Sequence, residues 1–508
     1  MAGGLCRCGP DAAVVWIILL STLIRLAFAA AFGLGIDESY MVAAGRALHI
    51  GYFDHPPASW WLTWAVTHLT GSEAPVVARA PFMALFALST WLMYRLTRRL
   101  YSPQAGVAAA LVMNLIPVLA LTSGTWVLPD GPLDAALLGA ALAMVRALEA
   151  RRPASFGWWA LAGLLAGIAL FSKYTAAGVL AGAFVFLLTA PAHRHWLARA
   201  EPYLAALLAL AVFSPVLVWN AQNDWASFAF QGSRAAAVVL RPLAPLRTLA
   251  GEALYVLPWI WLPLMVVTVR AVCRGPRADW RGWFFACLGL PLVAGFVIIS
   301  LWSSRQVMFH WAAPGYLMLV PLLGEAVARR LAAGDRLTRF WVRGTVALMV
   351  VVVLGAAALV RLDPMPGLWN RSQGARELVL DAVDWTALPA ELANRGLATG
   401  PDDVIAAVNW REAGKLDYAF GGRVPVICLN MDARQYGFNA WPSDYAGRDM
   451  IIVLRPRDEE RALMLAPFFR RFEDAGTVSV PLSGHTSLPL RVFIGRSLVA
   501  WPERPAGG

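Results

Sequence analysis

Three observations predict a polytopic α-helical membrane protein that ends in an α/β domain. Of the 508 residues, 59% are hydrophobic and only 15% are charged, which is too apolar for a soluble chain of this length. Apolar runs that approach the roughly 20 residues needed to cross a bilayer recur up to residue 360. Beyond that point the runs stop and the composition becomes mixed. We therefore predict a membrane domain over residues 1–360 and an α/β domain over residues 361–508.

The apolar runs set the expected number of membrane crossings. The longer runs cover residues 13–33, 76–94, 104–122, 132–149, 202–219, 250–271, 282–301, 312–328 and 341–360. Two shorter runs, 157–171 and 175–190, flank Lys173, and we interpret them as a hairpin with this lysine at its tip. The length criterion therefore predicts about 11 transmembrane helices.

The distribution of arginines predicts the orientation of the chain. Basic clusters fall in every second loop, at residues 95–99, 151–152, 194–199, 270–281 and 329–343. Because cytoplasmic loops carry an excess of Lys and Arg, the N-terminus is expected inside and the α/β domain outside. The net charge of +11 is explained by these short clusters, so we do not expect nucleic acid as a partner. The scattered cysteines predict neither a disulfide framework nor a zinc site.

The external segment from about residue 34 to 75 is too long for a turn. We expect two amphipathic helices on the outer surface, separated by the break at Pro56 and Pro57. Asp37 and Glu38 stand at the start of the first helix. Carboxylates beside a membrane are candidate catalytic residues, although either one would also serve as a helix cap.

The last 148 residues show the pattern of an α/β domain. Short strands are predicted at residues 404–408, 423–429, 450–454, 478–481 and 492–494, and helices at 375–394, 411–420 and 457–471. Gly421 and Gly422 follow a predicted helix instead of opening one, so a phosphate-binding loop is not expected.

Carboxylates and cations gather in the loops predicted to be external. They are Asp37, Glu38, Asp54, His55, Asp130, Lys173, Arg234, Arg305 and His310. Transfer of a sugar from a lipid-phosphate carrier needs a carboxylate base, cations that hold the leaving phosphate and an apolar groove. Lys173 interrupts apolar runs on the side opposite the basic clusters, which marks it as functional. Ordinary alternatives are a helix cap for Asp54 and a Pro-Asp-Gly turn for Asp130. Arg25, midway along the first span, predicts either a structural ion pair or a ligand contact.

The order of these motifs resembles the membrane glycosyltransferases of the GT-C fold. The likeness is to the branch of the protein O-mannosyltransferases and the bacterial lipid A aminoarabinose transferase, and it is strongest over residues 36–134. The segments that carry it are Asp37-Glu38, similar to the family's first acidic pair, Asp54-His55-Pro56-Pro57, Pro129-Asp130-Gly131-Pro132-Leu133, Ser172-Lys173-Tyr174, and His310-Trp311 with Tyr316.

The resemblance implies an inverting transferase of the bacterial inner membrane, with the α/β domain in the periplasm. Its donor would be an undecaprenyl- or other polyprenyl-phosphate sugar, and its acceptor a lipid, such as lipid A, or a polysaccharide. Asp37 would be the catalytic base, and Asp130 a second catalytic carboxylate that either orients the acceptor or supports the site. The implied substrate-binding residues are Glu38, Asp54, His55, Lys173, Arg234, Arg305, His310 and Tyr316. His55 stands where the aminoarabinose transferase motif has lysine, so a phosphate role there would depend on pH.

Other functions remain open from the sequence. A protein O-glycosyltransferase of the same fold is one alternative. A secondary transporter is another, although it calls for midplane ionisable groups and paired repeats, and the spans offer mainly Arg25. A membrane scaffold with an external binding domain is a third. A divalent metal held by Asp37, Glu38, Asp54 and His55 is possible, but no ligand spacing demands one.

Overall fold

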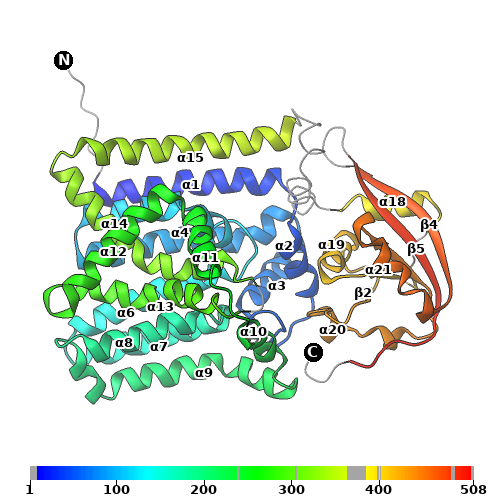
Figure 1. Ribbon diagram of the computed structural model, residues 1–508, viewed down its shortest axis with the longest axis horizontal. Helices are drawn as coiled ribbons and strands as arrows, with labels where there is room; N and C mark the ends of the chain where they lie inside the picture. The colour runs from blue at the N-terminus through cyan, green and yellow to red at the C-terminus, as the bar shows by residue number, and fades with distance from the viewer. Residues whose placement is uncertain are drawn as a thin grey trace.

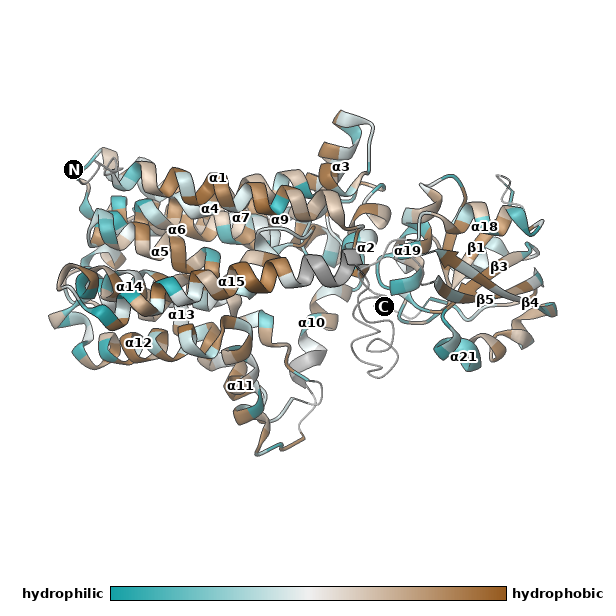
Figure 2. Ribbon diagram, turned by 90° about the horizontal axis from the view of Figure 1, so that it is seen from above, coloured by the Kyte–Doolittle hydropathy of each residue, from teal (hydrophilic) through white to brown (hydrophobic). Residues whose placement is uncertain are grey.

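The computed structural model of the protein describes residues 9–236, 239–303, 306–362, 385–397, 400, 402–481 and 487–504, with backbone only at 233–236 and 356–362. Figure 1 shows a bundle of long helices with a sheet domain at one end. The long apolar helices are α1 (Pro10–Ala31), α4 (Pro75–Leu100), α6 (Asp130–Glu149), α7 (Ala154–Ser172), α9 (Glu201–Gln222), α13 (Trp280–Ile299), α14 (Ala313–Ala332) and α15 (Arg336–Leu362). Figure 2 shows hydrophobic residues along the length of the bundle and a mixed pattern over the sheet domain.

The described part of the chain has eight helices that are long and apolar enough to cross a membrane, or nine with one bent pair. That pair is α11 (Ala244–Val256) and α12 (Pro258–Ala278), and two shorter apolar helices are α5 (Pro103–Leu115) and α8 (Ala176–Thr189). The chain is therefore a multi-pass α-helical membrane protein, as predicted, while the number of 11 crossings stays a prediction. The domain boundary predicted at residue 360 lies beside residues 363–384, which are outside the described residues.

Two of the spans predicted as continuous are broken, and a proline explains each break. Ile116 ends α5 in an extended conformation because Pro117 follows it, and the predicted span 104–122 continues as a separate π-helical turn, η1 (Leu119–Ser123). Leu257 has a positive φ of 80° before Pro258, and α11 and α12 meet there at a bend of 110°. The span predicted over 250–271 is therefore bent, because the helical region is disfavoured for a residue before proline.

The two ends of the bundle carry different ion pairs. At one end the arginines of the predicted cytoplasmic clusters contact acidic residues, in the pairs Arg98–Asp11, Arg99–Glu149 and Arg152–Glu201. Lys173 pairs with Asp130 at the other end, where α6 begins and α7 ends. The predicted alternation of loops therefore agrees with the folded bundle. Which end faces the cytoplasm stays a prediction.

The segment between α1 and α4 forms two helices, α2 (Ile36–Ala44) and α3 (Ala58–Thr70). Their existence confirms the prediction, but α2 does not lie exposed on the outer surface. Every residue from Glu38 to Ala44 is buried, because α2 packs against α19 (Trp410–Phe420) of the sheet domain. Figure 1 shows α2 between the bundle and that domain. Its apolar face serves the interface between the two parts instead of the membrane surface.

The C-terminal domain is built on one five-stranded mixed sheet in the order β2-β1-β3-β5-β4. Its strands are β1 (Val404–Ala407), β2 (Val426–Cys428), β3 (Met450–Leu454), β4 (Phe469–Pro481) and β5 (Ser487–Leu498). β1 lies parallel between β2 and β3, and β5 pairs antiparallel with β3 and β4. All five strands were predicted, although β4 and β5 are longer than expected.

Helices of the C-terminal domain match the prediction less closely. Helix α18 (Leu388–Asn394) covers the end of the predicted helix 375–394, whose residues 375–384 lie outside the described residues. The helix predicted over 457–471 is reduced to α21 (Glu459–Leu463), and β4 already begins at Phe469. Prolines 456 and 467 flank this helix, and each instead stands in a short 3₁₀ turn.

Candidate active site

Asp37 lies in the first turn of α2 with its side chain accessible to solvent. Among the described residues its carboxylate has no hydrogen-bond or ion-pair partner. The surrounding protein desolvates it and raises its pKa above the ordinary 3.8; Arg411 and Arg434 oppose this rise, while Asp54 and Glu38 add to it. An accessible, unshared carboxylate with a raised pKa has the properties of a general base.

Glu38, the other acidic residue of the pair, is fully engaged in the fold. Its carboxylate accepts from Arg79 Nε and Nη2 at 2.7 and 2.6 Å, and both side chains are almost completely buried. The same carboxylate accepts from the backbone N–H of Gly35 at 2.8 Å and of Val127 at 3.2 Å. Glu38 is therefore the residue that caps α2, and it fixes the start of that helix against α4 and the loop before α6.

Asp54 joins the external segment to the C-terminal domain. The Tyr40 hydroxyl donates to one carboxylate oxygen, and Arg434 Nη1 donates to the other. The backbone N–H of Gln435 in turn donates to the Tyr40 hydroxyl at 2.9 Å. Burial and the Asp54 charge raise the pKa of Tyr40 well above its ordinary value, so this phenol stays protonated and donates a hydrogen bond to Asp54. His55 follows Asp54 in the chain and is half-buried.

Asp130 and Lys173 are each other's partner. Lys173 Nζ donates to both carboxylate oxygens of Asp130 at 2.9 Å, and both side chains are buried. Asp130 begins α6 and Lys173 directly follows α7, so the pair ties two membrane helices together. Beside it, the Ser123 hydroxyl donates to Asp134 at 2.6 Å. A substrate that used either member of the pair would have to share it with the other.

The remaining predicted residues are spread more widely. The Tyr316 hydroxyl donates to Glu252 Oε2 at 2.7 Å and accepts from Trp261 at 2.9 Å, so it links α14 to α11 and α12. His310 lies in a short 3₁₀ turn before α14. Arg305 and the side chain of Arg234 lie outside the described residues. Arg25 forms no ion pair with a described residue, while the alternative of a ligand contact stays a prediction; its guanidinium donates to Asn114 at 3.3 Å and lies over the Phe86 ring.

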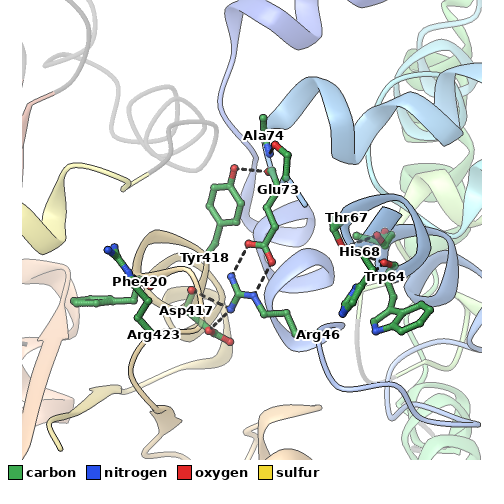
Figure 3. A network of polar contacts seen from close by, with 12 residues as sticks. Arg46, Trp64, Thr67, His68, Glu73, Ala74, Asp417, Tyr418, Phe420 and Arg423 are labelled. Atoms are coloured by element: carbon green, nitrogen blue, oxygen red, sulfur yellow. Dashed lines mark hydrogen bonds and ion pairs between the residues drawn. The ribbon is translucent and has the colours of Figure 1, made fainter. Parts of the chain in front are cut away.

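A network of polar contacts holds α19 against the external segment, and Figure 3 shows it from close by. Arg46, just after α2, makes two bonds of 2.7 Å to Glu73 and one of 2.5 Å to Asp417 of α19. The Tyr418 hydroxyl donates to the backbone oxygen of Glu73 at 2.9 Å. Because one guanidinium serves carboxylates from both parts of the chain, Arg46 fastens the sheet domain beside the start of α2.

Replacing Arg46 should loosen this attachment. Arg46→Ala leaves Glu73 and Asp417 facing each other without a cation, and we expect a loss of about 2 kcal/mol in the free energy of unfolding. Thermal unfolding in detergent measures it. Arg423→Ala is the matched control, since Arg423 donates only to the Phe420 carbonyl among the contacts drawn in Figure 3. Equal melting temperatures for both variants would contradict the role of Arg46.

Three side chains close to the Asp37–Glu38 pair escaped the sequence analysis. Arg79 was detectable, since it interrupts the apolar run at 76–94 near its external end. Arg411 and Arg434 gave no such signal. Arg434 reaches Asp54 across 380 positions of sequence, which no local pattern reports.

The four residues considered as metal ligands, Asp37, Glu38, Asp54 and His55, do not form one metal-binding group. Glu38 is turned to Arg79, and Asp54 to Tyr40 and Arg434. In the part of the chain that the structure describes, no three His, Cys, Asp or Glu side chains form a group able to hold a metal ion. The residues present therefore do not fit a metal site of that kind.

Comparison with solved structures defines the class of fold. ArnT from Cupriavidus metallidurans in the apo state matches with a TM-score of 0.63 and 16% identity, over 97% of this chain and 99% of that one. The same protein bound to undecaprenyl phosphate matches with a TM-score of 0.59 and 17% identity, over 96% and 99%. The chain has the GT-C fold of membrane-embedded glycosyltransferases, as its motifs predicted.

Sequence comparison points to particular relatives within this class. The family model of dolichyl-phosphate-mannose-protein mannosyltransferases matches residues 54–219. The chain is 25% identical to the lipid A galacturonosyltransferase RgtD of Rhizobium johnstonii over 286 residues. That match covers 56% of this chain and 58% of the relative.

Proposed function

We propose that the protein transfers a sugar from a polyprenyl-phosphate carrier to a lipid acceptor of the lipid A type at the periplasmic face of the inner membrane. The observation that carries this proposal is Asp37, an accessible carboxylate at the end of the bundle opposite the basic clusters. The similarity to RgtD and ArnT supports the donor and acceptor classes.

In the proposed reaction Asp37 takes the proton of the acceptor hydroxyl. The hydroxyl oxygen then forms a bond to the anomeric carbon, and the bond from that carbon to the carrier phosphate breaks with its electron pair leaving on the phosphate oxygen. Attack from the face opposite the leaving group inverts the anomeric centre. The Glu38–Arg79 pair acts indirectly, because it fixes the helical turn from which Asp37 projects.

The raised pKa of Asp37 predicts the acid limb of the pH–rate profile. The base must be ionised, so activity is present above its pKa and falls as the pH drops through it. We expect half-maximal kcat/KM at a pH above 3.8, the ordinary value for this carboxyl. Turnover measured across pH, with tryptophan fluorescence to confirm folding at each point, tests this. A rate that stays constant down to that pH would contradict the assignment.

A reconstituted assay tests the function itself. Purified protein in proteoliposomes is given undecaprenyl-phosphate carriers of a neutral hexose, a uronic acid and an amino sugar, with lipid A as acceptor. We expect transfer from one donor class to lipid A. Absence of transfer from all of them, in vesicles where a known transferase is active, would contradict the proposal.

The family-model match over residues 54–219 supports a second candidate, a protein O-glycosyltransferase. The same vesicles with an unfolded Ser/Thr-rich peptide in place of lipid A distinguish the two. Sugar found on the peptide and not on lipid A would favour this alternative.

A further inference from the structure

Helices α2 and α19 pack closely against each other. A Cβ placed on Gly414 would lie 2.9 Å from the Cα of Tyr40 and 3.0 Å from its backbone nitrogen, so glycine permits the two backbones to touch. Lys415 donates to the Leu34 carbonyl, just before α2, at 2.7 Å. Further along, Arg46 reaches Asp417. The first turns of the two helices therefore lie side by side.

This register places Arg411 next to Asp37. Each lies one helical turn before the Gly414–Tyr40 contact, Arg411 on α19 and Asp37 on α2. Both side chains are exposed, and the described residues form no ion pair between them. The Arg411 guanidinium lies 5.5 Å from the centre of the Trp410 ring, which limits its orientations. The positive charge of Arg411 opposes the rise in the pKa of the Asp37 carboxyl that desolvation causes.

Arg79 and Arg434 are already paired with carboxylates, Arg79 with Glu38 and Arg434 with both Asp54 and Asp432. Arg411 differs because no carboxylate among the described residues takes up its donors. Its guanidinium presents several N–H groups in a planar fork that matches two oxygens of a phosphate.

We propose that Arg411, supplied by the C-terminal domain, forms an anion subsite beside Asp37 that binds a phosphate group of a substrate. The proposal rests on the transferase function proposed above. The phosphate belongs either to the polyprenyl carrier, where charge grows as the sugar leaves, or to a phosphorylated lipid acceptor. In both cases the sheet domain completes the site.

Steady-state kinetics of Arg411→Ala and Arg411→Lys, with donor and acceptor varied separately, test the subsite. We expect kcat/KM to fall about 10- to 100-fold in Arg411→Ala, as for a lost charged hydrogen bond. Arg411→Lys should recover part of the loss, because it keeps the charge and loses the fork. A rise in KM for the carrier identifies the carrier phosphate, and a rise in KM for lipid A identifies the acceptor phosphate. Arg470→Ala, at an exposed site in the edge strand β4, removes the same charge as a control.

A second readout separates a direct role from a structural one. The charged groups that face Asp37 are Arg411, Arg434, Asp54 and Glu38, and only the first is changed. Removal of its positive charge should move the acid limb of the pH profile to higher pH in Arg411→Ala but not in Arg470→Ala. The subsite would be overturned, with the transferase function intact, if kcat/KM and KM of Arg411→Ala stayed within twofold of wild type and the acid limb of its pH profile did not move. Failure of the wild-type protein to transfer any sugar would instead overturn the proposed function.

Discussion

Asp37→Asn is expected to abolish sugar transfer while leaving the protein folded. An amide cannot accept the acceptor's proton, and general-base contributions are typically about 10²- to 10⁴-fold in rate. The structural cost should be small, because the Asp37 carboxylate has no hydrogen-bond or ion-pair partner among the described residues and is accessible to solvent. Transfer to lipid A in proteoliposomes measures the loss, and size-exclusion chromatography and thermal unfolding confirm the fold.

Asp402→Asn is the matched control for this experiment, since it makes the same change at an exposed carboxylate of the sheet domain. We expect it to behave as wild type. Near-normal turnover of Asp37→Asn would contradict the role of Asp37 as the general base. The neighbouring Asp54 would then have to be tested, although its carboxylate is already bonded to Tyr40 and Arg434.

Glu38→Ala should have the opposite signature, a large loss of stability. The substitution leaves the Arg79 guanidinium buried without its carboxylate, a change that typically costs about 3–5 kcal/mol. It also removes the cap of α2. We expect a strongly lowered melting temperature or failure to accumulate in the membrane, measured by thermal unfolding of the purified protein and by immunoblot.

Glu149→Ala provides the comparison for Glu38→Ala. Glu149 also pairs with an arginine, Arg99, but both side chains are largely exposed, and such pairs contribute about 0–1 kcal/mol. A Glu38→Ala protein that is as stable as Glu149→Ala yet inactive would show that Glu38 contacts substrate, as the sequence resemblance implies. The two adjacent carboxylates of α2 are thus distinguishable by stability alone.

Helical spans and sheet strands were predictable because each depends on local patterns. Long apolar runs indicate helices that face lipid, and short runs of residues that favour strands, in the last third of the chain, indicate the sheet. The breaks at Pro117 and Pro258 were also visible in the sequence, but hydropathy averaged over a run conceals a single proline. The burial of α2 was not predictable, because an apolar helix face looks the same whether it meets lipid or another domain.

The candidate site residues also divide into those that a local pattern reveals and those that depend on how the helices and domains pack. Asp37 and Lys173 were found because a charge beside an apolar run is conspicuous. The pairing of Lys173 with Asp130 was not found, since it depends on where α6 and α7 meet. Nothing in the sequence distinguishes Arg411 and Arg434 from other arginines of the C-terminal domain. Only the packing of that domain on the external segment brings Arg411 near Asp37 and Arg434 to Asp54.

The packing of α19 on α2 also has a consequence for how the protein is made. Arg46 and Asp417, which join these regions, are 371 positions apart in the chain. At a synthesis rate of about 5–20 residues per second, α2 waits roughly 20–70 s before α19 exists to cover it. During that interval Tyr40 and its buried neighbours have no partner from the C-terminal domain. The site is therefore among the last parts of the molecule to be completed, and a nascent chain already in the membrane is not yet an enzyme.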